Sequence, residues 1–203
     1  MTHFLKNFFI LFFFSLPLYA TPSDDLIQLL NNIHTMQATF NQTVLDTKGK
    51  ILNRSEGKMS LQRPGQFRWD VIQPNRQLIV TNGQKIWIYD VDLEQVTVRY
   101  LTHEAGEAPA LLLSNSNTTL THDFQVQVVN DAYVLMPRDK SSMFEAIQLR
   151  FANQHIREMR LQDHLGHVTV IQFNAVVMNS KLSAALFNFK TPAHVDVIDE
   201  THR

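Results

Sequence analysis

Residues 61–90 constrain the fold more than any other part of the chain, because turn signals divide them into three short apolar runs. They read LQRPGQFRWDVIQPNRQLIVTNGQKIWIYD. Proline fixes one backbone dihedral, so turns are expected at residues 63–65 and 73–75. Asn82-Gly83 favours a type I′ hairpin turn, which requires two positive φ values. The pattern therefore predicts consecutive antiparallel strands.

The strands of this region are apolar on more faces than a simple surface sheet needs. Phe67, Trp69 and Val71 alternate with other residues, so one face of the first strand is strongly apolar. The hairpin arms, residues 78–81 and 86–89, are apolar on both faces. Such a strand must be covered on both sides, or must line an interior that accepts apolar groups. This pattern favours a lipid-holding interior over a catalytic cleft.

The first twenty residues are typical of a secretory signal peptide. Lys6 precedes an almost wholly apolar run at residues 8–16, and Leu-Tyr-Ala at 18–20 suits a cleavage site. A membrane anchor is the alternative, but crossing a bilayer takes about 20 apolar residues. Residues 8–20 number thirteen and include a serine and a proline. We therefore expect a signal peptide at residues 1–20 and one domain at residues 21–203.

Composition limits the possible partners and the compartment. Without residues 1–20 the chain has 17 Lys and Arg residues, which is 18 minus Lys6, against 19 Asp and Glu, a formal charge of −2. No basic stripe is visible, so nucleic acid is not expected as a partner. The chain has no cysteine, and residue 21 is Thr. A bacterial lipoprotein needs a cysteine directly after its cleavage site, so we expect a soluble protein without that lipid anchor.

An amphipathic helix is expected from Ser23 to about Met36. The Ser23 hydroxyl can cap the helix, and two Asp residues follow it near the positive end of the helix dipole. Apolar residues then recur at helical spacing, at Leu26, Leu29, Leu30 and Ile33.

The rest of the chain reads mainly as strands. Pro109, well placed in the first turn of a helix, opens an apolar run at 110–113, so one or two short helices are expected between residues 102 and 121. About ten strands with two helical segments predict a wide half-barrel closed over by helices. Beyond the region already described, the expected strands are residues 38–45, 51–62, 95–101, 124–129, 133–136, 144–151, 156–162, 168–177 and 187–189.

An ordered series of short motifs resembles the LolA family of periplasmic lipoprotein carriers. The likeness covers essentially the whole chain after residue 20, although beyond about residue 143 it lies mostly in the strand pattern. The motifs are Gln62-Arg63-Pro64, Phe67-x-Trp69, Gln73-Pro74, Asn82-Gly83-x-x-Ile86-Trp87, Glu94-Gln95 and Phe187-Asn-Phe189-x-x-Pro192.

The resemblance implies a fold and a function. The fold would be mainly β: an incomplete antiparallel β-barrel of about ten strands, closed by a helical lid around a hydrophobic cavity. The protein would be a periplasmic chaperone, a monomer without cofactor, and its cargo the acyl chains of lipoproteins. It would receive them from an inner-membrane ABC-type release complex and deliver them to an outer-membrane receptor.

The resemblance also gives roles to particular residues, each with an ordinary alternative. Arg63 would be a latch that holds the lid shut through lid carbonyls, whereas an Arg before Pro-Gly is otherwise a solvated turn residue. The other two groups could equally be ordinary core. The acyl-chain cavity would be lined by Phe67, Trp69, Leu78, Val80, Ile86 and Ile88, and the lid would present Leu26, Leu29, Leu30, Ile33, Leu111, Leu112 and Leu113.

No motif indicates catalysis or a metal site. His164 and His167 flank Leu-Gly and read as a hairpin turn rather than a metal pair. His103-Glu104 is not accompanied by a Gly-x-Ser-x-Gly elbow, a phosphate-binding glycine loop or a His-Glu-x-x-His motif. Two alternatives stay open: a periplasmic binder of another amphiphile such as a glycolipid, and an enzyme on the same half-barrel.

Overall fold

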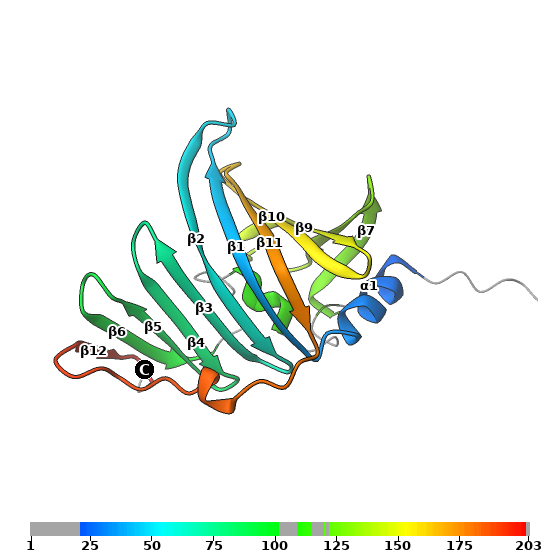
Figure 1. Cartoon of the computed structure of the whole chain (residues 1–203). Helices are drawn as coiled ribbons and strands as arrows, with labels where there is room; N and C mark the ends of the chain where they lie inside the picture. Colours follow the sequence, from blue (N-terminus) through cyan, green and yellow to red (C-terminus); the bar gives the residue numbers. More distant parts are fainter. Residues whose placement is uncertain (1–20, 102–108, 115–119, 121, 202–203) are drawn as a thin grey trace, which may run out of the picture.

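The computed structural model describes residues 21–101, 109–114, 120 and 122–201, and its main feature is one open, strongly curved sheet (Figure 1). The sheet has twelve strands in the order β12-β6-β5-β4-β3-β2-β1-β11-β10-β9-β8-β7. All neighbours are antiparallel except β12 and β6. The predicted antiparallel, mainly β fold is confirmed, with twelve strands instead of about ten.

The strands follow one another along the chain with few interruptions. They are β1 (Thr35–Leu45), β2 (Ile51–Gln62), β3 (Gln66–Gln73), β4 (Gln77–Asn82), β5 (Lys85–Asp90), β6 (Gln95–Tyr100), β7 (Phe124–Val129), β8 (Ala132–Pro137), β9 (Phe144–Ala152), β10 (His155–Asp163), β11 (Val168–Met178) and β12 (Asp196–Asp199). The helical elements are α1 (Pro22–Asn31) and the 3₁₀ helices η1 (Pro109–Ser114) and η2 (Ala184–Phe187). Within the described residues, no helix has the length and apolarity needed to cross a membrane.

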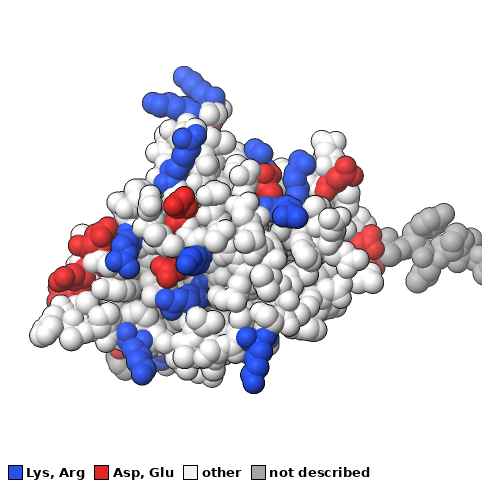
Figure 2. All heavy atoms as spheres, viewed as in Figure 1, with Lys and Arg blue, Asp and Glu red and all other residues white. Residues whose placement is uncertain are grey.

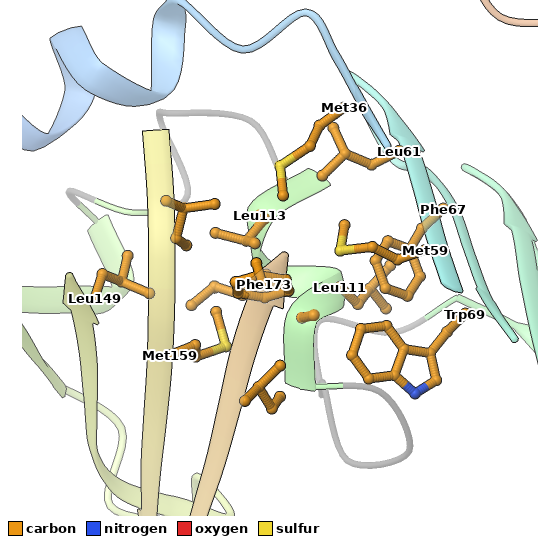
Figure 3. Close-up of a cluster of buried hydrophobic side chains, with 14 of the residues drawn as sticks. Met36, Met59, Leu61, Phe67, Trp69, Leu111, Leu113, Leu149, Met159 and Phe173 are labelled. Atoms are coloured by element: carbon orange, nitrogen blue, oxygen red, sulfur yellow. The ribbon is translucent and has the colours of Figure 1, made fainter. Parts of the chain in front are cut away.

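The main core lies inside the curve of the sheet, on what we call the inner face, the face that carries Phe67 and Trp69. The register places Phe67 opposite Leu61 and Trp69 opposite Met59, so these side chains share that face. Figure 3 shows Leu111 and Leu113 of η1 between two groups of inner-face side chains. On one side are Met36, Met59, Leu61, Phe67 and Trp69, and on the other Leu149, Met159 and Phe173. The helical segment η1 thus fills the space that the sheet encloses.

A glycine makes room for the closest ring contact of this core. Phe40 and Trp69 stack with ring centroids 3.5 Å apart and an interplanar angle of 11°. Gly57 is paired with Phe40 in β1 and with Val71 in β3. A Cβ on Gly57 would overlap the Asp70 carbonyl oxygen and lie 2.7 Å from Cζ of Phe40. No side chain fits there without moving the strand or the ring.

The opposite side of the sheet, the outer face, has a smaller apolar cluster of its own. Leu78 pairs with Tyr89 and Val80 with Trp87, on the face opposite the main core. The C-terminal segment covers them: η2 contacts β3 and β4, and the Phe189 ring lies 6.2 Å from that of Trp87 and 6.1 Å from that of Tyr89. This covering explains why the hairpin arms are apolar on both faces.

The predicted helix is displaced and shortened. The N-cap is Thr21 rather than Ser23: the Thr21 hydroxyl accepts from the Asp24 N–H, and the Asp24 carboxylate accepts from the Thr21 N–H. The helix ends at Asn31 instead of near Met36, because Met36 begins the alternation of β1. The apolar residues between the helix and the strand fit the helical spacing and also the two-residue alternation of a strand. The pairing of β1 with its neighbours makes the residues from Thr35 onward a strand.

Two further expectations were wrong. The last strand is not at residues 187–189, where η2 ends, but at β12, whose four residues are all exposed and therefore carry no apolar alternation. The Asn82-Gly83 turn is not type I′, because only Gly83 has a positive φ. Thr81 pairs with Ile86 across a longer loop, in which Asn82 Oδ1 accepts from the N–H groups of Gln84 and Lys85.

Gly57→Ala tests the packing of the inner face. Contact with a backbone carbonyl puts this overpacking at the upper end of the usual range, so we expect a loss of about 3 kcal/mol in the free energy of unfolding. Urea unfolding followed by tryptophan fluorescence measures it. Gly49→Ala is the control, because a Cβ added at Gly49 would have no contact within 4 Å beyond its chain neighbours. We expect this variant to lose only about 1 kcal/mol in the free energy of unfolding, the cost of a positive φ for alanine. Equal losses in the two variants would contradict this packing of the core.

Candidate functional site

The β2–β3 turn touches both helical segments of the inner face. Arg63 Nη1 donates a hydrogen bond to the Leu30 carbonyl at the end of α1, at 2.5 Å. The Arg63 N–H donates to the His34 carbonyl at 2.9 Å, and the Gly65 N–H to the Ser114 carbonyl of η1 at 2.8 Å. One three-residue turn is therefore bonded to α1, to the link after it and to η1.

The contact between Arg63 and Leu30 is electrostatically favourable. The last carbonyls of a helix carry partial negative charge, and the last turn of α1 contains no basic residue of its own. Arg63 supplies a cation there from another element. Partial burial lowers the pKa of the Arg63 guanidinium, although an arginine stays charged in proteins. A charged donor on a helix-end carbonyl forms a stronger bond than a neutral donor does.

The helical segments bury the leucines that the sequence singled out for a lid. Leu26, Leu30 and Ile33 are each 1% exposed, and Leu29 is half-buried. The η1 residues Leu111, Leu112 and Leu113 are also buried, and all of these except Leu29 belong to the main core cluster. Both helical segments therefore cover the inner face with apolar side chains.

The structure divides the six residues predicted to line a cavity between two faces. Phe67, Trp69 and Ile86 are buried in the inner-face core, and Ile88 packs against it. Leu78 and Val80 lie on the outer face under the C-terminal segment, away from that cluster. The sequence could not make this division, because both hairpin arms are apolar on both faces.

Several inner-face residues were missed by the sequence analysis. Met36, Phe40, Leu61 and Phe173 are at most 2% exposed and belong to the same cluster. The alternation Met36-Ala38-Phe40 was the available signal, and it was hidden because the expected helix extended over its first residue. Phe173 lies in a stretch that was predicted as a strand without an assignment of its faces.

The histidine pair forms a turn, as predicted. The Asp163 carboxylate accepts from the N–H groups of Leu165 and His167, and His167 Nδ1 lies 3.0 Å from Asp163 Oδ2. Within the described part of the chain, no group of three or more His, Cys, Asp or Glu residues is arranged to hold a metal ion. His103 and Glu104 lie outside the described residues.

Charges are dispersed over the face of the molecule seen in Figure 2. Lys and Arg lie beside Asp and Glu in the middle of this face, Lys and Arg predominate at its upper projecting end, and most of the surface is uncharged. This face shows no continuous basic stripe of the kind that nucleic-acid binding requires.

Comparison with known proteins identifies the family. The family model for outer membrane lipoprotein carrier protein LolA matches residues 31–190. The chain belongs to the LolA family. A relative from Azotobacter vinelandii named outer-membrane lipoprotein carrier protein is 41% identical over 181 residues, which cover 86% of each chain. A relative of the same name from Legionella pneumophila (strain Corby) is 41% identical over 196 residues, 94% of this chain and 96% of its own.

Solved structures support the fold of this LolA-family chain. A LolA superfamily protein from Nitrosomonas europaea superimposes with a TM-score of 0.52 at 12% identity, over 84% of this chain and 99% of its own. An uncharacterized conserved protein from Thermus thermophilus has a TM-score of 0.52 at 13% identity, over 87% and 99%. At such low identity these structures show a shared architecture only.

Proposed function

We propose that this protein is a periplasmic carrier of lipoproteins, which binds the acyl chains of lipoproteins released from the inner membrane and delivers them to the outer membrane. The observation that carries the proposal is the 41% identity to proteins named outer-membrane lipoprotein carrier protein, over most of both chains. The inner face supports it, since it offers a large apolar surface covered by short helical segments rather than by a second sheet. The function is carriage without catalysis.

The structure corresponds in this proposal to the empty, closed carrier. The open sheet is an incomplete barrel, and α1 and η1 together are its lid. The η1 leucines occupy the space between the two groups of inner-face side chains. Acyl chains would take that place when the lid moves outward, so the cavity is made by displacing η1. Phe67, Trp69, Ile86 and Ile88 would then contact the cargo.

Energetics explain why the empty carrier should close. Burial of a methylene is worth ~0.8 kcal/mol, so roughly forty methylenes of a triacylated lipoprotein would sum to roughly 30 kcal/mol. That exceeds the ~20 kcal/mol at which non-covalent affinity saturates, and such a carrier would not release its cargo. A lid that buries its own leucines on the same surface lowers the net free energy gained when cargo binds, because cargo must displace those leucines. Release then becomes possible.

Arg63 is the proposed latch of this lid. A hydrogen bond from a charged donor contributes ~1.5–3 kcal/mol, which a few buried methylenes offset. The bonds of residues 63–65 to both α1 and η1 therefore favour the closed state without preventing loading.

The remaining assignments follow from the same role. Residues 1–20 would be a signal peptide and residues 21–203 one carrier domain, active in the periplasm as a monomer without cofactor. An inner-membrane ABC-type complex would hand over the lipoprotein, and an outer-membrane receptor would accept it.

A release assay tests the function directly. Spheroplasts that hold a radiolabelled triacylated lipoprotein in the inner membrane are incubated with the purified protein. We expect the lipoprotein to appear in the soluble fraction, bound to the protein, because its acyl chains are shielded from water. Lipoprotein that stays with the spheroplasts would contradict the proposal. Mass spectrometry of ligands that co-purify from the periplasm would then identify another amphiphile, such as a glycolipid.

Arg63→Leu tests the latch. The variant should load lipoprotein at least as well as the wild type, because the open state costs less. It should transfer its cargo to outer-membrane fractions about tenfold more slowly or worse, as expected from losing a bond of ~1.5–3 kcal/mol. Arg68→Leu is the matched control, since Arg68 lies on the neighbouring strand and pairs with Asp70 on the outer face. Transfer by Arg63→Leu at the rate of Arg68→Leu would exclude the latch.

A further inference from the structure

The side chain of Asn179 bonds the link between α1 and β1 to the end of β11. Its Oδ1 accepts from the N–H groups of His34, at 2.9 Å, and Thr35, at 3.4 Å. Its Nδ2 donates to the Asn32 carbonyl at 2.8 Å. The network fixes the orientation of the amide, because the oxygen faces two donors and the nitrogen faces an acceptor.

The surrounding backbone reinforces this junction. The Asn179 N–H donates to the Thr35 carbonyl at 2.8 Å, and the Thr35 hydroxyl donates to the Ser180 carbonyl at 2.7 Å. Asn179 has a φ of 58°, in the left-handed region that Asn adopts more readily than most residues. Residues 32–35 are therefore bonded to the point where β11 ends, near the foot of α1 in Figure 1.

We propose that Asn179 is a positioning residue that fixes the pivot of α1 and thereby sets where the Leu30 carbonyl meets Arg63. Helix α1 ends at Asn31, directly before the segment that Asn179 holds. The carbonyl that accepts the 2.5 Å bond from Arg63 belongs to Leu30, one residue before the last residue of the helix. A shift of the helix end by a little over 1 Å moves this bond beyond hydrogen-bond distance. The effect on cargo transfer rests on the proposed function, whereas the effect on the helix does not.

A pair of glycine variants separates the side chain from the backbone conformation. Asn179→Gly removes all three side-chain bonds, while glycine keeps the positive φ without strain. Asn179 is exposed, so the substitution leaves no buried cavity. Asn153→Gly is the matched control, because Asn153 is also exposed and has a φ of 51°, in the β9–β10 turn.

Amide hydrogen exchange measures how firmly the end of α1 and the link after it are held, and it requires no cargo. In Asn179→Gly we expect the amides of His34 and Thr35 to exchange about tenfold faster, as the loss of two hydrogen bonds implies. The amides of Leu30 and Ile33 should also exchange faster, because the end of α1 is then less firmly held. The Asn153→Gly variant should leave all four unchanged. Equal exchange at these amides in the two variants would overturn the proposal.

Transfer of a fluorescent triacylated lipopeptide to phosphatidylethanolamine and phosphatidylglycerol vesicles measures the consequence for the latch. Asn179→Gly should slow transfer about fivefold, the effect of one ordinary hydrogen bond. Added to Arg63→Leu it should have no further effect, because it acts only through Arg63. A fall in the thermal unfolding midpoint with additive transfer defects would assign a merely structural role and overturn the proposal.

The two proposals fail in different ways. If Arg63→Leu transfers the lipopeptide normally, the latch is wrong, and hydrogen exchange still decides whether Asn179 positions α1. If Arg63→Leu is slow but Asn179→Gly behaves like Asn153→Gly in exchange and transfer, the latch stands and the positioning role is excluded.

Discussion

The inner face of the sheet must be covered by apolar groups at all times, and the rest of the structure depends on that constraint. A curved sheet lined by Phe67, Trp69 and Met59 cannot be left in water, because each buried large side chain is worth about 1.5–3 kcal/mol. The chain covers this surface with leucines from two short helical segments. A cover made of so few turns, bonded to one turn of the sheet, can be exchanged for another apolar partner.

In the proposed exchange the sheet would keep its shape. The stacking of Phe40 on Trp69 beside Gly57 fixes the centre of the inner face by close packing. The outer face has its own cover, in which the C-terminal segment places Phe187 and Phe189 over β3 to β5. The apolar groups of one face are therefore held separately from those of the other, and the inner cover is bonded to the Arg63 turn.

Strands were predictable from the sequence wherever one face is apolar and the other is not, as in β3, where Phe67 and Trp69 alternate with charged residues. Strand β12 was not predictable, because it is exposed throughout and is paired with β6 through its backbone. Faces could not be assigned where both are apolar, because alternation then does not distinguish them. Leu78 and Val80 were therefore grouped with residues of the inner face, although they lie on the outer face.

The candidate site was predictable only in part. Arg63 precedes Pro-Gly, which by itself indicates a solvated turn residue. Its role came from the resemblance, since nothing in the spacing connects it to Leu30, 33 residues earlier. Asn179 gave no signal, because an Asn after a strand is an ordinary turn residue. Its importance comes from tertiary contacts with residues about 145 positions away.

The central claim is that the proposed lid, α1 together with η1, moves off the inner face when acyl chains enter. The chain contains no cysteine, so a double variant with Gln28→Cys on α1 and Asn53→Cys on β2 carries spin labels at these two positions and nowhere else. Both positions are exposed. Pulsed electron resonance then measures their separation with and without a triacylated lipopeptide. We expect one narrow distance in the empty protein and a longer or broader distribution in the loaded protein. An identical distribution in both states, with the lipopeptide bound, would contradict the claim.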